Sequence, residues 1–260
     1  MPYKNLNGIE LYYETSGEGE PLLFIHGLGS STRDWQDQVK CFSDKFQTVT
    51  VDLRGHGQTE KPPSTYSISL FASDVAALIE EVEGPVHVAG ISMGGMVALQ
   101  LAVDYPEMVK SLILINTQDE VLLNTRQARQ AVMIRKVIPR LMGMKWMGKY
   151  LGKKLFPEED QGHFRELIAN RWAENSVKDY TKSVNAIAGW SVRKHLQSIK
   201  CPVLVVASEL DYTPVGAKEV YVKILPDARL EVIKGARHAV SVERPEELNK
   251  VMMGFLRPDL

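Results

Sequence analysis

Short apolar runs alternate with amphipathic stretches along most of this 260-residue chain, and this alternation limits the possible fold more than any other feature. Each run is bounded by Gly, Pro or polar residues and is too short for a helix, so it predicts a buried strand. The runs are 22–25, 48–51, 86–89, 112–115, 203–207 and 230–233. Between them, apolar residues recur at helical spacing in 69–82, 93–103 and 245–255. The pattern predicts an α/β fold: a mainly parallel, twisted sheet covered by helices.

The first strands of the chain are predicted to pair differently. Segments 3–6 and 9–14 alternate polar and apolar residues and flank Asn7-Gly8. Asn-Gly adopts the positive φ angles of a tight turn at low cost, so the chain is expected to open with an antiparallel hairpin.

The alternation stops between about Gln118 and Gly189, where no strand-like run occurs. Ala131, Ile134, Ile138 and Leu141 have helical spacing there, and Arg129, Lys136 and Arg140 fall on the opposite face. The interpretation is a helical cap (118–189) inserted into one core domain formed by 1–117 and 190–260.

The first half of this insertion is strongly basic, with no Asp or Glu from Val121 to Pro157. Its nine cations are Arg126, Arg129, Arg135, Lys136, Arg140, Lys145, Lys149, Lys153 and Lys154. A solvated cationic face explains them most simply. Attraction of an anionic substrate, or weak association with an anionic membrane surface, are the alternatives.

Composition excludes several other classes of protein. Lys plus Arg number 31 and Asp plus Glu 32, so the net charge of −1 provides no field that would hold a nucleic acid. The two cysteines, Cys41 and Cys201, have neither zinc spacing nor a disulfide framework, which favours a reducing compartment. No apolar signal region follows Met1, and the apolar runs are far shorter than the roughly 20 residues of a membrane span. A cytoplasmic protein without stable membrane insertion is therefore expected.

The segment Gly90-Ile91-Ser92-Met93-Gly94 is the strongest chemical signal. It has the G-x-S-x-G pattern and stands between a predicted strand and a predicted helix, which is the context of a nucleophile elbow. Such a sharp turn strains the serine backbone and exposes its hydroxyl at the carboxyl edge of the sheet. Ser92 is the predicted nucleophile, and a structural turn is the alternative.

A serine nucleophile needs a histidine base and an acid that orients the histidine. His238 follows the last predicted strand and Asp211 follows 203–207, so both should reach the edge where Ser92 emerges. The order Ser92, Asp211, His238 is typical of this architecture. Other carboxylates compete for the role of the acid: Glu209, Asp119 and Glu120.

The oxyanion of an acyl-transfer intermediate needs hydrogen-bond donors. The expected donors are the backbone N–H groups of Met93 and of Leu28, which lies in the Gly-rich loop after strand 22–25. That loop also resembles a dinucleotide-binding turn, but it lacks the third glycine. The chain has no phosphate-binding loop and no paired histidines at metal spacing, so neither a cofactor nor a metal is expected.

Together these motifs resemble those of the α/β-hydrolase superfamily over essentially the whole chain. The segments that carry the resemblance are His26-Gly27-Leu28-Gly29-Ser30, 52–59, Gly90–Gly95, Asp211 and Gly235-Ala236-Arg237-His238. The resemblance implies an eight-stranded sheet with a helical cap over the site. Within the superfamily the chain is similar to small bacterial carboxylesterases and 3-oxoadipate enol-lactonases, notably at 183–188 and 199–204, but it departs from the lactonases at Trp190-Ser191-Val192-Arg193.

The sequence thus predicts a serine hydrolase that cleaves small carboxylic esters or lactones through an acyl-enzyme. Carbon–carbon bond hydrolysis of a ring-cleavage product by the same triad, or a non-catalytic ligand receptor on this fold, are the rival interpretations. Pocket walls are expected from the cap, with Trp146, Trp172 and Trp190 as candidates. The alternative for each is a place in the cap's own core. Oligomeric state does not follow from the sequence.

Overall fold

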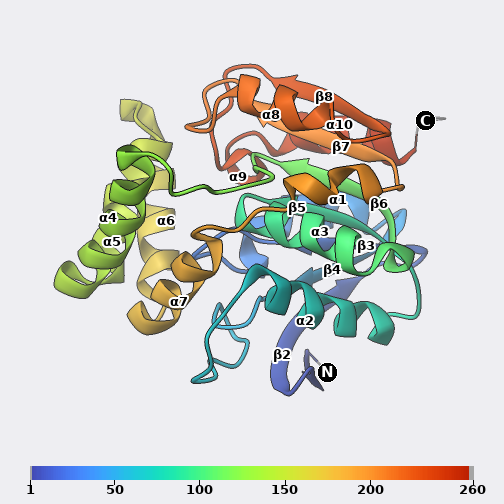
Figure 1. The fold of residues 1–260 in the computed structure, drawn as a ribbon, viewed down its shortest axis with the longest axis horizontal. Helices are drawn as coiled ribbons and strands as arrows, with labels where there is room; N and C mark the ends of the chain where they lie inside the picture. Colours follow the sequence, from blue (N-terminus) through green and yellow to red (C-terminus); the bar gives the residue numbers. More distant parts are fainter. Residues whose placement is uncertain (1, 258–260) are drawn as a thin grey trace.

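The computed structural model describes residues 2–257 and contains an eight-stranded sheet with the strand order β1-β2-β4-β3-β5-β6-β7-β8 (Figure 1). The strands are β1 (Tyr3–Leu6), β2 (Ile9–Ser16), β3 (Glu20–Ile25), β4 (Phe46–Val51), β5 (Val86–Ile91), β6 (Val109–Ile115), β7 (Val203–Ser208) and β8 (Ala228–Ile233). β1 and β2 form the antiparallel hairpin, β2 also pairs antiparallel with β4, and all remaining pairs are parallel. The predicted fold class is confirmed.

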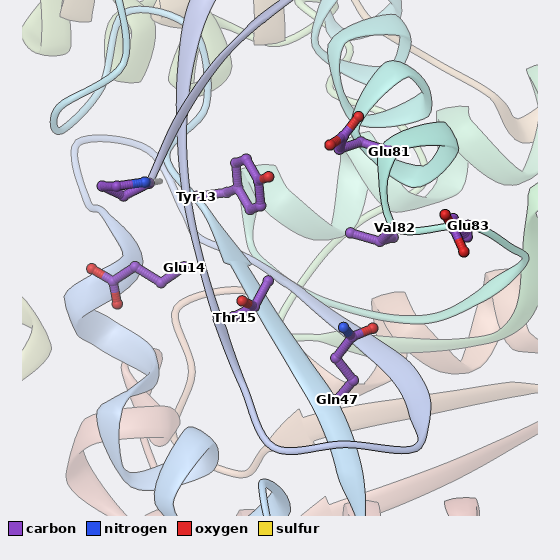
Figure 2. Close-up of a pocket in the computed structure, with 8 residues that line it drawn as sticks. Tyr13, Glu14, Thr15, Gln47, Glu81, Val82 and Glu83 are labelled. Atoms are coloured by element: carbon purple, nitrogen blue, oxygen red, sulfur yellow. The ribbon is translucent and has the colours of Figure 1, made fainter.

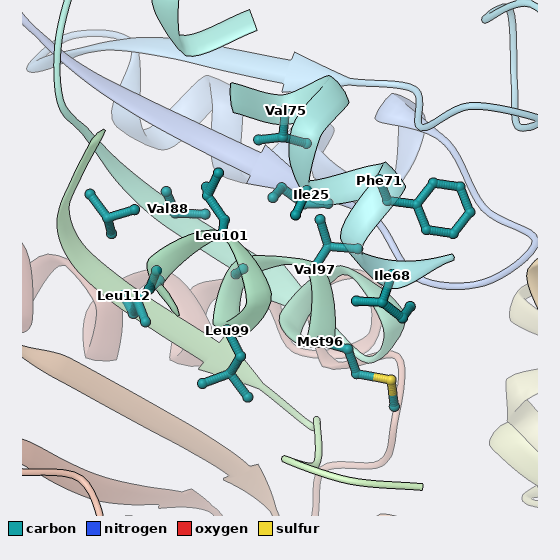
Figure 3. Close-up of a cluster of buried hydrophobic side chains, with 14 of the residues drawn as sticks. Ile25, Ile68, Phe71, Val75, Val88, Met96, Val97, Leu99, Leu101 and Leu112 are labelled. Atoms are coloured by element: carbon teal, nitrogen blue, oxygen red, sulfur yellow. The ribbon is translucent and has the colours of Figure 1, made fainter. Parts of the chain in front are cut away.

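The sheet is buried on both faces because alternate strand residues point in opposite directions. The covering helices are α1 (Gln36–Phe42), α2 (Ile68–Glu81), α3 (Met93–Asp104), α8 (Val215–Val222), α9 (Val240–Glu243) and α10 (Pro245–Leu256). Leu23 and Val88 join one apolar cluster with helices α2 and α3, while their neighbours Phe24 and Ala89 join a second with α1 and α10. Figure 3 shows the first cluster, where Val97 and Leu101 of α3 lie between α2 and the strands.

Between β6 and β7 the chain leaves the sheet and forms four helices that lie beside it (Figure 1). These helices, here called the four-helix segment, are α4 (Arg126–Met142), α5 (Met144–Leu155), α6 (Gly162–Ala173) and α7 (Val177–Ile187). They bury a third apolar cluster of their own. Leu28 from the loop after β3 and Ala239 from the loop after β8 pack against that cluster. The four-helix segment therefore borders the carboxyl ends of the strands.

The expected apolar face of α4 is correct at Ile138 but wrong at Leu141. Leu141 is 79% exposed, whereas Val132 and Ile138 pack against the third cluster and Pro139 is buried. The inward face of α4 is set by the surface that it docks on, and a four-residue apolar spacing in an otherwise basic helix does not fix that rotation. Arg135 lies between Val132 and Ile138 and shares their face.

Among residues 2–257 no helix is both long and apolar enough to cross a membrane.

Candidate active site

Ser92 stands at the turn between β5 and α3 in a strained backbone conformation, with φ 55° and ψ −116°. A side chain in this region is rare and marks positions where surrounding structure enforces the geometry. Gly90 and Gly94 make the turn possible. A Cβ on Gly90 would lie 2.4 Å from the Gly94 carbonyl oxygen, and one on Gly94 would lie 2.1 Å from the carbonyl oxygen of Ile25.

This packing predicts that Gly94→Ala destabilises the protein. The new methyl group would collide with the backbone of β3, which cannot move without breaking the sheet, so we expect a loss of about 2 kcal/mol or more in the free energy of unfolding. Gly254→Ala in α10 is the matched control, because nothing lies within 4 Å of its added Cβ. The control is expected to be neutral or to gain up to about 1 kcal/mol from helix propensity. Urea denaturation of both variants measures the difference, and equal stabilities would contradict the steric argument.

His238 and Asp211 meet at the edge where Ser92 emerges. His238 Nδ1 lies 2.8 Å from Asp211 Oδ1, and the Asp211 side chain is fully buried. Because an ionised carboxylate can only accept, Nδ1 carries the proton and Nε2 is free to act as an acceptor. The pair thus holds the imidazole in the tautomer that a general base for a serine requires.

A buried lysine supports the same carboxylate. Lys218 of α8 places Nζ 3.1 Å from Asp211 Oδ2 and 2.7 Å from both the carbonyl and hydroxyl oxygens of Thr213. The Thr213 hydroxyl also donates to Asp211. Burial alone would raise the pKa of Asp211, but His238, Thr213 and Lys218 together lower it to about 2. Asp211 is therefore ionised at any pH near neutrality.

Tyr212 occupies the space between the base and the nucleophile. Its hydroxyl lies 2.9 Å from His238 Nε2 and also lies beside the Ser92 side chain. Within residues 2–257 Ser92 makes no direct hydrogen bond to His238. The Tyr212 hydroxyl must therefore give up its bond to Nε2 before Ser92 can pass its proton to His238 directly. Sequence reasoning missed Tyr212, although its position next to Asp211 was a signal.

Asn116, also missed, fixes the loop that carries His238. It follows β6, has a positive φ of 46° and is buried. Its Nδ2 donates to the carbonyl oxygens of Arg237 and His238 at 3.2 and 3.0 Å, and its Oδ1 accepts from the Ser208 N–H at 2.8 Å. Asn116 thereby ties the loops that follow β7 and β8 to the end of β6.

The loop after β3 lies directly against the nucleophile. A Cβ on Gly27 would lie 3.4 Å from the Cβ of Ser92. In the part of the chain that the structure describes, the N–H groups of Leu28 and Met93 donate to no protein acceptor. Asn175 of the four-helix segment donates to the Gly29 carbonyl oxygen at 2.9 Å and holds this loop in place. These two N–H groups, which are the expected oxyanion donors, therefore have no other partner, and Leu28 directly follows the glycine that contacts Ser92.

The competing carboxylates have other partners. Asp119 forms a bidentate pair with Arg193 at 2.8 Å, and Glu120 lies 3.1 Å from the same guanidinium. Glu209 accepts from the Gly235 N–H at 2.8 Å. Each of these contacts ties one loop to another, and Asp211 is the carboxylate that reaches His238.

The three tryptophans lie in different environments. Trp172 is 6% exposed and sits against Gly29, since a Cβ there would be 3.0 Å from its ring. Trp146 is 39% exposed and stacks on Tyr150. Trp190 donates to Gln100, about two turns along α3 from Ser92, at 2.8 Å. Trp172 is therefore the one of the three that adjoins the loop carrying Leu28.

A groove of about 550 Å³ lies elsewhere, between β2, the start of β4 and the end of α2 (Figure 2). Gln47 is the second residue of β4 and Glu83 precedes β5, so the groove is at the amino edge of the parallel strands, opposite Ser92. Its lining contains three glutamates and no nucleophile paired with a base. Over residues 2–257, no group of three or more His, Cys, Asp or Glu side chains is placed to hold a metal ion.

Comparisons with known proteins agree with the fold. The model of the alpha/beta hydrolase fold family matches residues 20–245. The 3-oxoadipate enol-lactonase 2 of Acinetobacter baylyi is 30% identical, over 96% of this chain and 94% of its own. A second protein of that organism, (E)-2-((N-methylformamido)methylene)succinate hydrolase, is 29% identical, over 96% of this chain and 95% of its own. The enol-lactonase structure from Burkholderia xenovorans LB400 superposes with a TM-score of 0.91 at 24% identity, covering 98% of this chain and 99% of its own. The chain belongs to the α/β-hydrolase fold family.

Proposed function

We propose that the protein is a serine hydrolase that cleaves small carboxylic esters or lactones through an acyl-enzyme at Ser92. The observation that carries the proposal is the short contact between His238 Nδ1 and buried Asp211, at the sheet edge where the strained Ser92 emerges. Such a pair costs stability to bury and is typical of a base held ready for proton transfer.

In the proposed reaction the substrate carbonyl enters beside Ser92, and His238 Nε2 accepts the proton of the Ser92 hydroxyl as its oxygen attacks. The tetrahedral intermediate places its oxyanion on the N–H groups of Leu28 and Met93. Asp211 stabilises the imidazolium that forms and remains ionised. His238 then donates the proton to the leaving oxygen, and the acyl-enzyme remains.

Water hydrolyses the acyl-enzyme in the second half of the reaction, with the same residues in the same roles. His238 Nε2 takes a proton from a water molecule as its oxygen attacks the acyl carbonyl. The imidazolium then donates that proton to the Ser92 oxygen as the acyl–oxygen bond breaks, which releases the carboxylic acid and restores the Ser92 hydroxyl. In a lactone the leaving oxygen stays attached to the acyl part, so one hydroxy acid is the product. No metal or organic cofactor enters this scheme.

Tyr212 is proposed to take part in substrate entry. Its hydroxyl contacts His238 Nε2 and lies beside Ser92, where the reacting atoms of a substrate must fit. Its side chain is 56% exposed and belongs to a loop, so it can swing away without disturbing the core. The four-helix segment, with Trp172 beside the Gly27–Gly29 loop, would form the wall opposite the sheet.

A substrate panel tests the proposal. It comprises nitrophenyl esters of increasing acyl length, five- and six-membered lactones, an anilide, and a dienoate ring-cleavage product. We expect turnover of the short esters and the lactones, with a burst of nitrophenol from acyl-enzyme formation and little cleavage of the anilide. Exclusive cleavage of the dienoate would favour carbon–carbon bond hydrolysis. A folded protein that turns over none of them would favour a ligand receptor.

A further inference from the structure

The inward face of α4 directs a guanidinium at the candidate active site. Arg135 follows Val132 and precedes Ile138 by three residues each, and these neighbours pack against the third apolar cluster. Arg135 Nη1 donates to the buried hydroxyl of Tyr180 at 3.3 Å, and the guanidinium also lies beside the hydroxyl of Tyr212. An exposed basic face does not explain these contacts.

Tyr212 connects this cation to the reacting groups. Its hydroxyl is bonded to His238 Nε2 at 2.9 Å and lies beside Ser92. The Arg135 guanidinium and the His238 imidazole thus both lie next to the Tyr212 side chain. A group bound by Arg135 would lie only a few atoms from the bond that Ser92 attacks.

Arg135 has no anionic partner inside the protein. Arg54, which is buried more deeply than Arg135, pairs with Asp74 at 2.6 Å, and the half-buried Arg193 pairs with Asp119. Within residues 2–257, no carboxylate oxygen lies within 4 Å of the Arg135 guanidinium, and α4 and α5 contain no acidic residue at all. A partly buried guanidinium faced only by two phenol hydroxyls retains unused donors and an uncompensated charge.

The other cations of the basic segment behave differently. Seven of the nine side chains, all but Arg135 and Lys136, are exposed to solvent: Arg126, Arg129, Arg140, Lys145, Lys149, Lys153 and Lys154. These seven side chains form the solvated cationic face that is the simplest explanation of the basic segment in the sequence. Arg135 and Lys136 are both half-buried, and Arg135 differs from Lys136 in its position next to Tyr180 and Tyr212.

We propose that Arg135, with the hydroxyls of Tyr180 and Tyr212, forms a carboxylate-binding subsite next to Ser92, so that the preferred esters or lactones carry a free carboxylate a few atoms from the scissile bond. The planar guanidinium suits a carboxylate because it can donate two parallel hydrogen bonds to it. When the substrate carboxylate takes up these donors, Tyr212 is released from its present contacts. This inference rests on the proposed hydrolysis at Ser92.

Two matched substrate pairs test the subsite. Monomethyl glutarate and methyl pentanoate differ by a carboxylate replaced with a methyl group on the acyl side, and 4-acetoxybutanoate and butyl acetate differ in the same way on the leaving side. We expect wild type to prefer the anionic member of at least one pair. In Arg135→Gln the preference, measured as a ratio of kcat/KM values, should fall about 10- to 100-fold, mainly through KM.

Arg140→Gln is the matched control, because it removes the same charge from an exposed position of the same helix. Its preference should remain within about threefold of wild type, since screening by salt weakens distant surface charges. An equal fall in both variants would mean a general field and would overturn the subsite. A fall in kcat/KM of the same size for neutral and anionic substrates would mean a structural role, and would overturn it as well.

Binding of glutarate provides a readout that does not need turnover. Glutarate should raise the melting temperature of wild type and of Arg140→Gln but not that of Arg135→Gln, and Arg135→Lys should retain part of the effect. If Arg135→Gln does not fold, Arg135→Lys is measured in its place. Weaker glutarate binding and a smaller preference for anionic substrates in Arg135→Lys would support the subsite, and wild-type values of both would contradict it. If wild type hydrolyses neutral esters and shows no preference for a carboxylate, the subsite is contradicted but the proposed function is not. If wild type binds glutarate and hydrolyses no ester, the proposed function is contradicted but the subsite is not.

Discussion

Ser92→Ala should lower kcat for ester hydrolysis by about 10⁴-fold or more, while the protein stays folded. Alanine removes the attacking oxygen but leaves the backbone turn, the Gly90 and Gly94 packing and the oxyanion donors intact. His238→Ala should give a loss of similar size, because without its base the Ser92 hydroxyl is a weak nucleophile.

The double variant distinguishes a cooperating pair from two independent contributions. If Ser92 and His238 act in one proton transfer, removing both should cost little more than removing either. Rates that multiply, or a Ser92→Ala variant that keeps more than about one per cent of wild-type kcat, would contradict the assignment of Ser92. Circular dichroism and the urea midpoint of each variant control for unfolding.

The protein should lose stability steeply between pH 6.5 and 4 because two buried histidines must stay neutral. His26 and His56 are fully buried, with ring centroids 5.0 Å apart. His26 Nε2 accepts from the Leu53 N–H at 3.0 Å, which a protonated ring cannot do. Burial lowers the pKa of His26 to about 4; burial and the neighbouring His26 lower that of His56 to about 3.

The direction of the effect follows from where the protons bind. In the unfolded chain both histidines have an ordinary pKa of about 6.5. Below that pH the unfolded state therefore binds protons that the folded state does not bind. Stability is complete above pH 6.5 and falls as the pH drops toward the folded values. We expect a loss of about 4 kcal/mol in the free energy of unfolding between pH 7.5 and 5. Asp211, whose pKa is lowered to about 2, adds a further loss only below about pH 4.

Urea denaturation at a series of pH values measures this dependence. Wild type should take up close to two protons on unfolding between pH 6 and 4.5. His56→Phe should reduce that number to about one, whatever the variant's absolute stability, because its ring no longer titrates. His195→Phe, at an exposed position, is the matched control and should leave the proton uptake as in wild type. A flat stability between pH 6.5 and 4.5 would contradict the argument.

The arrangement of strands could be predicted because it depends on local pattern. Strands buried on both faces must be short apolar runs, and Asn7-Gly8 has the backbone freedom of a hairpin turn. Loops that follow parallel strands reach the same edge, and this topological rule was enough to place Asp211 and His238 near Ser92. Their contact at 2.8 Å follows from topology as much as from residue type.

The remaining features depend on tertiary contacts that leave no local pattern. The rotation of α4 about its axis is set by the apolar cluster that it packs on. Residue spacing alone therefore predicted Leu141 on the buried face and did not distinguish Arg135 from the other basic residues. In the sequence, Lys218 looks like an ordinary residue of an amphipathic helix. In the structure its side chain is fully buried against Asp211. Asn116 likewise acquires its role only when three loops meet around it.

Covalent labelling is the most direct test of our claim that Ser92 is an activated nucleophile. Wild type is treated with a fluorophosphonate, and the modified residue is located by peptide mass spectrometry. We expect a single adduct, on Ser92, that forms at least about 100-fold more slowly in His238→Ala and does not form in Ser92→Ala. No adduct on the folded protein, an adduct on another residue, or labelling of Ser92 that does not depend on His238 would contradict the claim.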